Sequence, residues 1–344
     1  MDMYVDIEIA AIKLVDKKGL LMKTYRLVLN VTNTCNMKCF FCYRASANTS
    51  KKDHMSIENA KTVMDLVYND DRFEKDVQFL GAEPTMNMEV VKYVMDNYPD
   101  CNYEITTNGY FVNDESNIPY MKRMNHITVS IESTEALFNK VRGGKNLHDL
   151  VDKVLAMKHP NCSFSITANK DFFNNIEEFI PLYNKIMSNG HNISFKQLDA
   201  VDNGFVDTKD YLTCLKILRD FFHKNIKSEQ FDQDTCALDR AITVQPDLSV
   251  LPCHGFAGHL DLGLKITEIP DILFAVNEMA DMFAVHKDRP LPICKGCILE
   301  NKYCRNRCSV SGGIPLYVKD KELFEKQCEM RIISYLLSTG EIEI

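Results

Sequence analysis

The sequence predicts an α/β fold built on a parallel sheet, either a barrel or a doubly wound sheet. Six short segments rich in β-branched and aromatic residues recur between residues 24 and 199, and most are followed by a stretch with helical spacing of apolar residues. Parallel strands need a crossover connection, and a helix is the usual one. The order strand, helix, strand therefore favours βα units over an antiparallel arrangement.

The first unit shows both periodicities. Residues 24–33, TYRLVLNVTN, alternate in the manner of a strand, and residues 56–69 follow with helical spacing. Ser56 is expected to cap the start of this helix. Its apolar positions Ile57, Ala60, Met64 and Val67 share one face, which predicts a helix packed against the sheet.

The later units repeat this order. Strands are expected at DVQFLG, NYEITTNG, HITVSIE, SFSITAN and ISFKQLD, and helices over residues 88–98, 147–158, 175–189 and 209–225. In such sheets, functional groups gather at the carboxyl ends of the strands. The segments CNMKCFFC, GAEPTMN, TTNG and SIES each follow one of the first four strands. We therefore expect them to line one rim.

Composition limits the function classes. The 344 residues carry a net charge of −8, so the composition does not indicate the basic surface that binds nucleic acid. The sequence contains no run of 18 apolar residues, so no membrane span is predicted. The acidic start does not resemble a secretory signal. We therefore expect a cytoplasmic protein with no membrane or nucleic-acid partner. Thirteen cysteines in such a chain indicate metal rather than disulfides.

The cysteines form two groups. Three lie in CNMKCFFC, at Cys35, Cys39 and Cys42. Seven lie in the last third of the chain, at Cys236, Cys253, Cys294, Cys297, Cys304, Cys308 and Cys328. The others, Cys101, Cys162 and Cys214, match no motif and are expected to be core residues. This separation predicts two metal-bearing regions.

Three clustered thiolates are one fewer than a closed tetrahedral zinc site needs. A cubane iron–sulfur cluster has four irons that each take one external ligand, so three cysteines leave one iron open. An open iron can chelate the amine and carboxylate of S-adenosylmethionine (SAM). Electron transfer from such a cluster into the sulfonium breaks a carbon–sulfur bond and releases an adenosyl radical.

The cysteine spacing resembles the defining CxxxCxxC motif of the radical SAM superfamily, with Phe41 as its usual aromatic residue. The resemblance covers nearly all of the chain and implies a partial (β/α)6 TIM barrel. GAEP, which comprises Gly81, Ala82, Glu83 and Pro84, is similar to the family's GGEP motif. The resemblance implies that it binds the methionine amino group through the backbone and Glu83, with Ala82 as a one-methyl departure.

The same resemblance implies three further cofactor contacts. Ser130 matches a serine that helps to hold the methionine carboxylate, although Glu132 and Ser133 replace the family's aspartate and glycine. Arg142 matches an arginine that is common at this distance, and its guanidinium suits a carboxylate. Leu198 is placed where the family packs an apolar side chain near adenine. The alternatives are a surface arginine and an ordinary core leucine.

The C-terminal third resembles the SPASM extension, which carries two auxiliary [4Fe–4S] clusters. Carried over by position, Cys236, Cys253 and Cys308 bind the first, and Cys294, Cys297, Cys304 and Cys328 bind the second. Leu248 stands where this extension usually has glycine. The chain then divides into an N-terminal segment 1–23 with a possible small hairpin, a barrel 24–228 and an extension 229–344. The alternative is a zinc ribbon of Cys294, Cys297, Cys304 and Cys308.

The resemblance implies a peptide-modifying enzyme with three [4Fe–4S] clusters and SAM. The expected reaction is a thioether or carbon–carbon crosslink in a ribosomally made peptide, with the auxiliary clusters as electron acceptors. Implied partners are a peptide or protein substrate, flavodoxin or ferredoxin as reductant, and a separate leader-binding protein. His254, next to Cys253, is the candidate catalytic base. Two alternatives stay open: oxidation of cysteine or serine to formylglycine, and a non-catalytic zinc-binding interaction module.

Overall fold

The computed structural model describes most of the predicted barrel and parts of the region after it. The described residues are 25–39, 42, 53–168, 170–197, 212–213, 216–217, 241–251, 253–254, 264–269, 271, 294–299, 322, 325, 328–329, 332–333, 336 and 341. Several predictions lie outside them, namely those for residues 1–23, Phe41, Leu198, Cys214, Cys236, Cys304 and Cys308.

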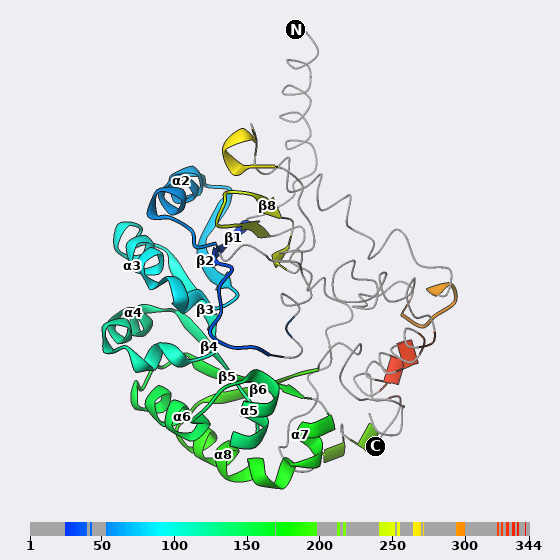
Figure 1. The fold of residues 1–344 in the computed structure, drawn as a ribbon. Helices are drawn as coiled ribbons and strands as arrows, with labels where there is room; N and C mark the ends of the chain where they lie inside the picture. The colour runs from blue at the N-terminus through cyan, green and yellow to red at the C-terminus, as the bar shows by residue number, and fades with distance from the viewer. Residues whose placement is uncertain are drawn as a thin grey trace.

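A sheet in the order β6-β5-β4-β3-β2-β1-β7-β8 forms the centre of the described fold (Figure 1). The six predicted strands are all present and parallel: β1 (Tyr25–Thr32), β2 (Phe73–Gly81), β3 (Asn102–Thr107), β4 (His126–Ile131), β5 (Cys162–Ala168) and β6 (Asn192–Gln197). The prediction of an α/β fold with a parallel sheet is therefore confirmed.

Two further strands were not predicted. β7 (Ala241–Val244) pairs in parallel with β1, and β8 (Val250–Leu251) pairs antiparallel with β7. They lie within the segment 229–344 and extend the barrel sheet on the side of β1 away from β2. Strands of four and two residues are too short to show a period in the sequence.

The helices cover the outer face of the sheet (Figure 1). They are α2 (Ile57–Val67), α3 (Met88–Asn97), α4 (Ile118–Arg123), α5 (Glu135–Arg142), α6 (Leu147–Ala156), α7 (Lys170–Asn174) and α8 (Ile176–Ser188). Short 3-10 turns are η1 (Pro84–Asn87), η2 (Tyr110–Asn113), η3 (Glu115–Asn117) and η6 (Ile266–Glu268). The helices predicted at 56–69, 88–98, 147–158 and 175–189 are confirmed, whereas α4, α5 and α7 were missed. The helix predicted at 209–225 lies mostly outside the described residues.

Local chemistry explains the start of α2. The amide of Asn59 donates to Ser56 Oγ at 3.0 Å, so the predicted N-cap is confirmed. Ala60, Met64 and Val67 are buried as expected. No helix among the described residues is both long and apolar enough to cross a membrane.

The strands alternate between two environments. In β4, Ile127, Val129 and Ile131 are buried in the core beneath the helices, whereas Thr128 and Ser130 on the opposite face are half-buried. Cys101 and Cys162 are buried, which confirms that they are core residues. The apolar face thus holds the fold together, and the opposite face is left with polar side chains.

Candidate functional site

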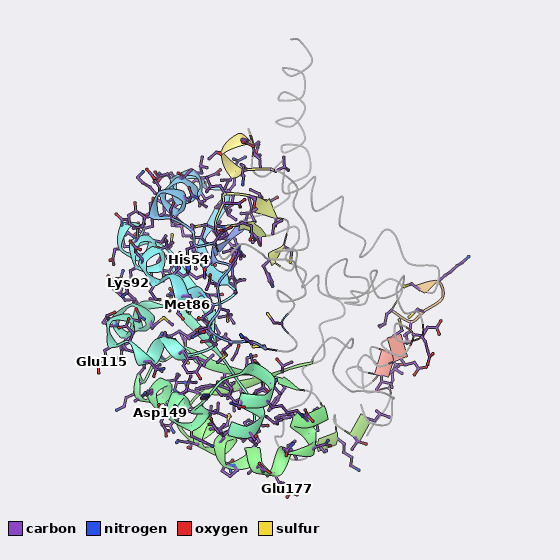
Figure 2. The ribbon with its side chains drawn as sticks, viewed as in Figure 1. His54, Met86, Lys92, Glu115, Asp149 and Glu177 are labelled. Carbon is purple, nitrogen blue, oxygen red and sulfur yellow. The ribbon has the colours of Figure 1, made fainter. Side chains whose placement is uncertain are left out.

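The segment that carries the first three cysteines begins and ends at the carboxyl end of β1. The amide of Asn33 donates to Asp53 O at 2.8 Å, and that of Met55 donates to Val31 O at 2.9 Å. The ring nitrogen of His54, labelled in Figure 2, lies 3.2 Å from Thr32 Oγ1. Residues 33 and 55, on either side of this segment, are thus both hydrogen-bonded near the carboxyl end of β1, at the rim of the sheet.

We call residues 34–39 the cysteine loop. Three hydrogen bonds tie alternate loop residues to the segments after β2, β3 and β4 in turn: Glu83 N to Thr34 O at 3.0 Å, Asn108 Nδ2 to Asn36 Oδ1 at 2.6 Å, and Lys38 N to Arg142 O at 3.1 Å. The loop, dark blue in Figure 1, therefore runs across the carboxyl ends of three neighbouring strands. The expectation that the motifs after the first four strands share one rim is confirmed.

The three thiols lie close enough to influence one another. Cys35 is exposed and Cys39 and Cys42 are half-buried. Desolvation, partly offset by a hydrogen bond from Met37 N to Cys35 Sγ at 3.3 Å, raises the pKa of Cys35 to about 11, and Glu83 and the other two thiols add to this shift. Thiolates grouped in this way need a positive centre to compensate their charge.

The donor set fits an iron–sulfur cluster by its chemistry. Among the described residues, no three His, Cys, Asp or Glu side chains are grouped closely enough to bind a single metal ion. An iron–sulfur cluster takes one thiolate per iron and so accommodates ligands that are more widely separated. Cys35, Cys39 and Cys42 therefore fit such a cluster by residue type and by their spacing in the sequence.

GAEP lies directly against the end of β1. A Cβ atom on Gly81 would lie 2.6 Å from Thr32 O, so only glycine permits this approach. The next amide, Ala82 N, donates to Thr32 O at 2.9 Å. Gly81 thus brings GAEP against the end of β1, just before the cysteine loop begins, and the alanine at position 82 leaves the backbone hydrogen bond in place.

The Glu83 carboxylate is buried and held by its own chain. It accepts hydrogen bonds from Thr85 N at 3.1 Å, Thr85 Oγ1 at 2.6 Å, Thr107 Oγ1 at 2.7 Å and Asn108 N at 2.7 Å. Burial raises the pKa of Glu83, and these hydrogen bonds oppose that shift. The carboxylate therefore joins the end of β2 to the end of β3, and its predicted contact with the methionine amino group stays a prediction.

Asn108 is a site residue that sequence reasoning did not single out. Its backbone amide donates a hydrogen bond to Glu83, and its Nδ2 donates one to Asn36 Oδ1. Its Oδ1 accepts a hydrogen bond from Tyr110 N at 3.1 Å. Gly109, with φ 89°, allows the tight turn that makes these bonds compatible. The Asn-Gly pair after a strand was the available signal, because such pairs mark turns in which asparagine bonds nearby backbone.

The end of β4 contributes a buried ion pair. Arg142 Nε lies 2.7 Å from Glu132 Oε1, and both residues are buried. Burial raises the pKa of Glu132 to about 7, with Arg142 acting in the opposite direction. Burial raises the pKa of the Cys39 thiol, and the positive charge of Arg142 opposes this shift. The alternative of a surface arginine is therefore wrong. Ser130, predicted beside the methionine carboxylate, lies on the polar face of β4.

The second cysteine group is described only in part. Cys294 and Cys297 form a turn in which Cys297 N donates to Cys294 O at 3.0 Å and Gly296 has φ 79°. Leu299 N then donates to Cys297 Sγ at 3.4 Å. Cys328 is half-buried. Because their predicted co-ligands lie outside the described residues, the two auxiliary ligand sets stay predictions.

The region around Cys253 bears on two further predictions. His254 Nδ1 lies 3.9 Å from Cys253 Sγ, so the candidate base is next to a predicted cluster ligand. Leu248, in the turn between β7 and β8, has φ 69°. Leucine thus occupies the left-handed conformation for which the related extension uses glycine.

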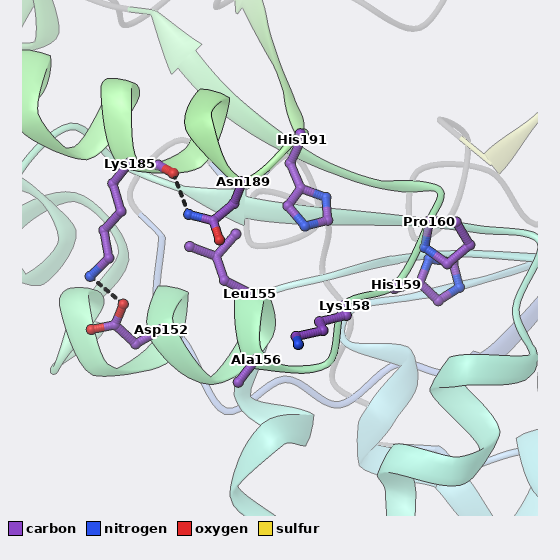
Figure 3. Close-up of a pocket in the computed structure, with 10 residues that line it drawn as sticks. Asp152, Leu155, Ala156, Lys158, His159, Pro160, Lys185, Asn189 and His191 are labelled. Atoms are coloured by element: carbon purple, nitrogen blue, oxygen red, sulfur yellow. Dashed lines mark hydrogen bonds and ion pairs between the residues drawn. The ribbon is translucent and has the colours of Figure 1, made fainter.

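A separate cavity of about 470 Å³ lies at the amino ends of β5 and β6, away from the cysteine loop (Figure 3). His159 and His191 line it. His159 Nδ1 accepts from Asn161 N at 3.1 Å and its Nε2 donates to Met124 O at 2.9 Å. Burial lowers the pKa of His159. None of the described residues that line this cavity is a cysteine, so it is distinct from the candidate site.

Residues 29–167 match the family model of the radical SAM superfamily. This span runs from β1 to β5 and includes the cysteine loop, GAEP and the Glu132–Arg142 pair. The chain carries a radical SAM domain. The family resemblance seen in the sequence is thereby confirmed, and radical SAM proteins are enzymes that use SAM and a SAM-binding [4Fe–4S] cluster.

Curated relatives are similar over parts of the chain. An uncharacterized protein, MJ0907 of Methanocaldococcus jannaschii, is 32% identical over 45% of this chain and 56% of its own length. The radical SAM cyclopropyl synthase TigE of Paramaledivibacter caminithermalis is 25% identical over 69% of this chain and 58% of its own length. The chain thus spans somewhat more than half the length of these two relatives.

A solved structure shares the fold over a longer range. SuiB of Streptococcus suis, solved with SAM, has a TM-score of 0.66 at 16% identity and covers 93% of this chain and 80% of its own. SuiB has also been solved with its precursor peptide SuiA. At this identity the likeness shows the fold alone, which is the partial barrel expected from the sequence.

Proposed function

We propose that this protein is a radical SAM enzyme that modifies a ribosomally made peptide, leading to a thioether or carbon–carbon crosslink. The observation that carries the proposal is the cysteine loop lying across the ends of β2, β3 and β4, in hydrogen-bond contact with GAEP and Arg142. Thiols, backbone donors and a buried carboxylate thus meet at the rim where α/β barrels bind their substrates.

Each part of this rim has a role in the proposal. Cys35, Cys39 and Cys42 hold a [4Fe–4S] cluster that supplies the electron for reductive cleavage of bound SAM. The backbone of GAEP and the Ser130 hydroxyl bind the methionine part of SAM. Glu83, through its bonds to Thr107 and Asn108, fixes the GAEP backbone that makes this contact.

The polar face of the sheet supports a peptide as substrate. Below the rim it presents half-buried hydroxyls, among them Thr106, Thr128 and Ser163. Thr128 Oγ1 and Ser163 Oγ are 3.4 Å apart, and Ser163 Oγ is 3.2 Å from His126 Nε2. Such groups match the amide donors and acceptors of a peptide backbone better than they match an apolar ligand. The similarity to TigE, a cyclopropyl synthase, and to SuiB, solved with a precursor peptide, agrees with this choice.

The rest of the proposal concerns the extension. The seven later cysteines would hold two auxiliary [4Fe–4S] clusters, which would supply an acceptor for the electron that the substrate loses, and His254 would take the proton. Flavodoxin or ferredoxin supplies the reducing electron. Because thiolate ligands must stay reduced until they bind iron, we place the enzyme in the cytoplasm.

The test is the mass of candidate peptides encoded near the gene, after anaerobic incubation with the reconstituted enzyme, a reductant and SAM. A loss of two hydrogens without reaction towards a carbonyl reagent supports a crosslink. The same loss with a reactive aldehyde would instead assign formylglycine formation. A variant with alanine at Cys35, Cys39 and Cys42 is the control, because it should leave every peptide unchanged.

An unchanged peptide in the presence of SAM cleavage would contradict the assignment of that peptide as substrate. A colourless protein that binds zinc and cleaves no SAM would overturn the enzyme proposal and favour the interaction module. Absorbance and iron content separate these outcomes before any peptide is tried.

A further inference from the structure

One face of the short strand β7 carries polar side chains that the proposed function does not use. Ile242 and Val244 belong to the main core, so by alternation Thr243 and Gln245 lie on the polar face of the sheet. The parallel register of β7 with β1 places Gln245 beside Asn30. Thr243 and Asn30 are fully buried and Gln245 is 8% exposed, so these polar groups are kept from solvent.

Asn30 fixes the way in which the Gln245 side chain faces. Asn30 Nδ2 donates to Gln245 Oε1 at 2.5 Å and to Asn33 Oδ1 at 3.1 Å. Because both hydrogens of this amide go to oxygens, Gln245 presents its oxygen to Asn30 and its NH2 group away from it. The backbone of Gln245 is held as well, since its amide donates to Ser249 O at 2.8 Å and its carbonyl accepts from Leu248 N at 3.0 Å. The carboxamide is therefore held in one orientation.

Two groups on this face are left available for a ligand. Thr243 Oγ1 and Gln245 Nε2 are buried and have no hydrogen-bond partner among the described residues. A hydroxyl and an amide NH2 can both donate, and we call these two groups the β7 donors. Burying a donor without a partner destabilises a fold, and native proteins contain few such groups. The β7 donors therefore indicate that an acceptor from outside the chain binds here.

The spacing and the place of the β7 donors suit an extended peptide. Residues two apart on a strand are separated by about 6–7 Å, which is also the distance between alternate carbonyls of an extended chain. Asn33, which Asn30 bonds, directly precedes the cysteine loop. A Cβ on Gly81 would lie 3.2 Å from Asn30 Oδ1, so GAEP is equally close. A peptide bound by the β7 donors would thus lie beside the rim that carries the candidate site.

We propose that Thr243 and Gln245 bind the peptide substrate, each donating a hydrogen bond to a backbone carbonyl of an extended segment, with Asn30 orienting Gln245. Backbone carbonyls are common to all peptides, so these contacts hold the chain in place without selecting its sequence. The proposal rests on the peptide substrate of the proposed function and adds where on the sheet that peptide binds.

The test is the steady-state kinetics of the reconstituted full-length protein with the peptide that the mass assay identifies. Thr243→Val replaces the hydroxyl with a methyl group of similar size. We expect the KM for the peptide to rise about three- to tenfold with kcat unchanged, because the lost contact is made equally in the ground state and the transition state. The thermal midpoint should equal or exceed that of the wild type, since a buried hydroxyl without a partner is removed.

Gln245→Met removes the second donor and should raise KM by a similar factor. It also removes the acceptor for Asn30, so its thermal midpoint should fall, and Thr243→Val decides alone if this variant does not fold. Thr62→Val is the matched control. It makes the same change on α2, where the hydroxyl already donates to Glu58 O at 2.9 Å, and its KM should equal that of the wild type.

An unchanged KM in Thr243→Val would overturn the proposal, and so would a rise that Thr62→Val shares. A rise in Thr243→Val alone, without loss of thermal stability, would support it, because a purely structural hydroxyl would change the thermal midpoint and not KM. Failure of the proposed function looks different. The wild-type protein would then leave every peptide unchanged, which refutes the peptide substrate before any variant is compared.

Discussion

Polar groups are buried at both ends of the strands, which we call the carboxyl edge and the amino edge of the sheet. Their hydrogen-bond partners differ between the two. At the carboxyl edge, Glu83 and Glu132 accept hydrogen bonds from other elements, and their charges act on the thiols of Cys35 and Cys39 respectively. At the amino edge, His159 and His191 each bond a backbone carbonyl of a neighbouring segment, and the thiols of Cys101 and Cys162 are buried in the core.

The difference shows what identifies a functional site in this fold. The described cavity lies at the amino edge, whereas buried carboxylates, a guanidinium and grouped thiols lie at the carboxyl edge. Burying such charges costs free energy, so a fold retains them where they act. The chemistry of the side chains therefore locates the site better than the size of a cavity. Substitutions at the carboxyl edge should therefore affect iron binding and SAM cleavage, whereas those at the amino edge should affect stability alone.

The largest expected difference is between two sets of cysteines. Changing Cys35, Cys39 and Cys42 to alanine should abolish reductive cleavage of SAM and remove about four irons, because one cluster loses its protein ligands. The matched control changes Cys101 and Cys162 to alanine, which removes buried thiols from the amino edge. Iron content and deoxyadenosine formation measure both variants. Equal iron loss in the two variants would contradict the conclusion that the carboxyl edge, and not the amino edge, binds the cluster.

The second effect concerns the contact between β1 and GAEP. Gly81→Ala should destabilise the protein by about 1–3 kcal/mol and displace GAEP, because the new Cβ meets Thr32 O. Ala82→Gly changes the neighbouring residue to that of the related motif and should cost at most about 1 kcal/mol. Thermal midpoints and SAM affinity, measured side by side, compare the two. A tighter or unchanged affinity in Gly81→Ala would show that the close approach does not position the cofactor.

The third effect compares the two ends of β3. Asn108→Ala removes a side-chain donor to Asn36 and should make iron loss to a chelator several times faster, at a cost of about 1–2 kcal/mol in stability. Asn102→Ala, at the amino end of the same strand, removes bonds to Asp76 and Asn125. It should leave the rate of iron loss unchanged. Chelation followed by absorbance measures this rate, and equal rates would contradict a specific role for Asn108.

The fourth effect belongs to the amino edge and depends on pH. Burial lowers the folded-state pKa of His159 below its ordinary value of 6.5, so the unfolded chain binds this proton more readily. Its contribution to stability is present above pH 6.5 and is lost as the pH falls through and below that value. His159→Gln should therefore flatten the decline of the thermal midpoint between about pH 7 and pH 5. SAM cleavage at neutral pH should not change in this variant. A loss of cleavage would show that His159, at the amino edge, contributes to the reaction.

The parts of this molecule that depend on local pattern could be predicted from the sequence. Strand alternation, the cap at Ser56 and the spacing of Cys35, Cys39 and Cys42 are all local, and the structure confirms the strands and the cap. The bonds of Asn108 to Glu83 and Asn36 join residues that come together only when β1, β2 and β3 are in register. The ion pair of Glu132 with Arg142 forms only when α5 packs back against the end of β4. β7 was missed for a related reason, because its four residues are stabilised by pairing with β1 and not by a period of their own.

The smallest expected effect concerns Leu248, which stands where the SPASM extension usually has glycine. Leu248 adopts φ 69°, a conformation that costs a leucine about 1–2 kcal/mol, although it also packs partly against the main core. Leu248→Ala and Leu248→Gly both remove this packing, but only glycine also relieves the backbone. The glycine variant should therefore be more stable than the alanine variant by about 1 kcal/mol, which thermal midpoints can resolve. At an ordinary position the order is reversed, since glycine gains more entropy on unfolding. An alanine variant more stable than the glycine variant would mean that the turn between β7 and β8 does not hold this residue in the left-handed conformation, and that the hairpin leading to Cys253 is built differently.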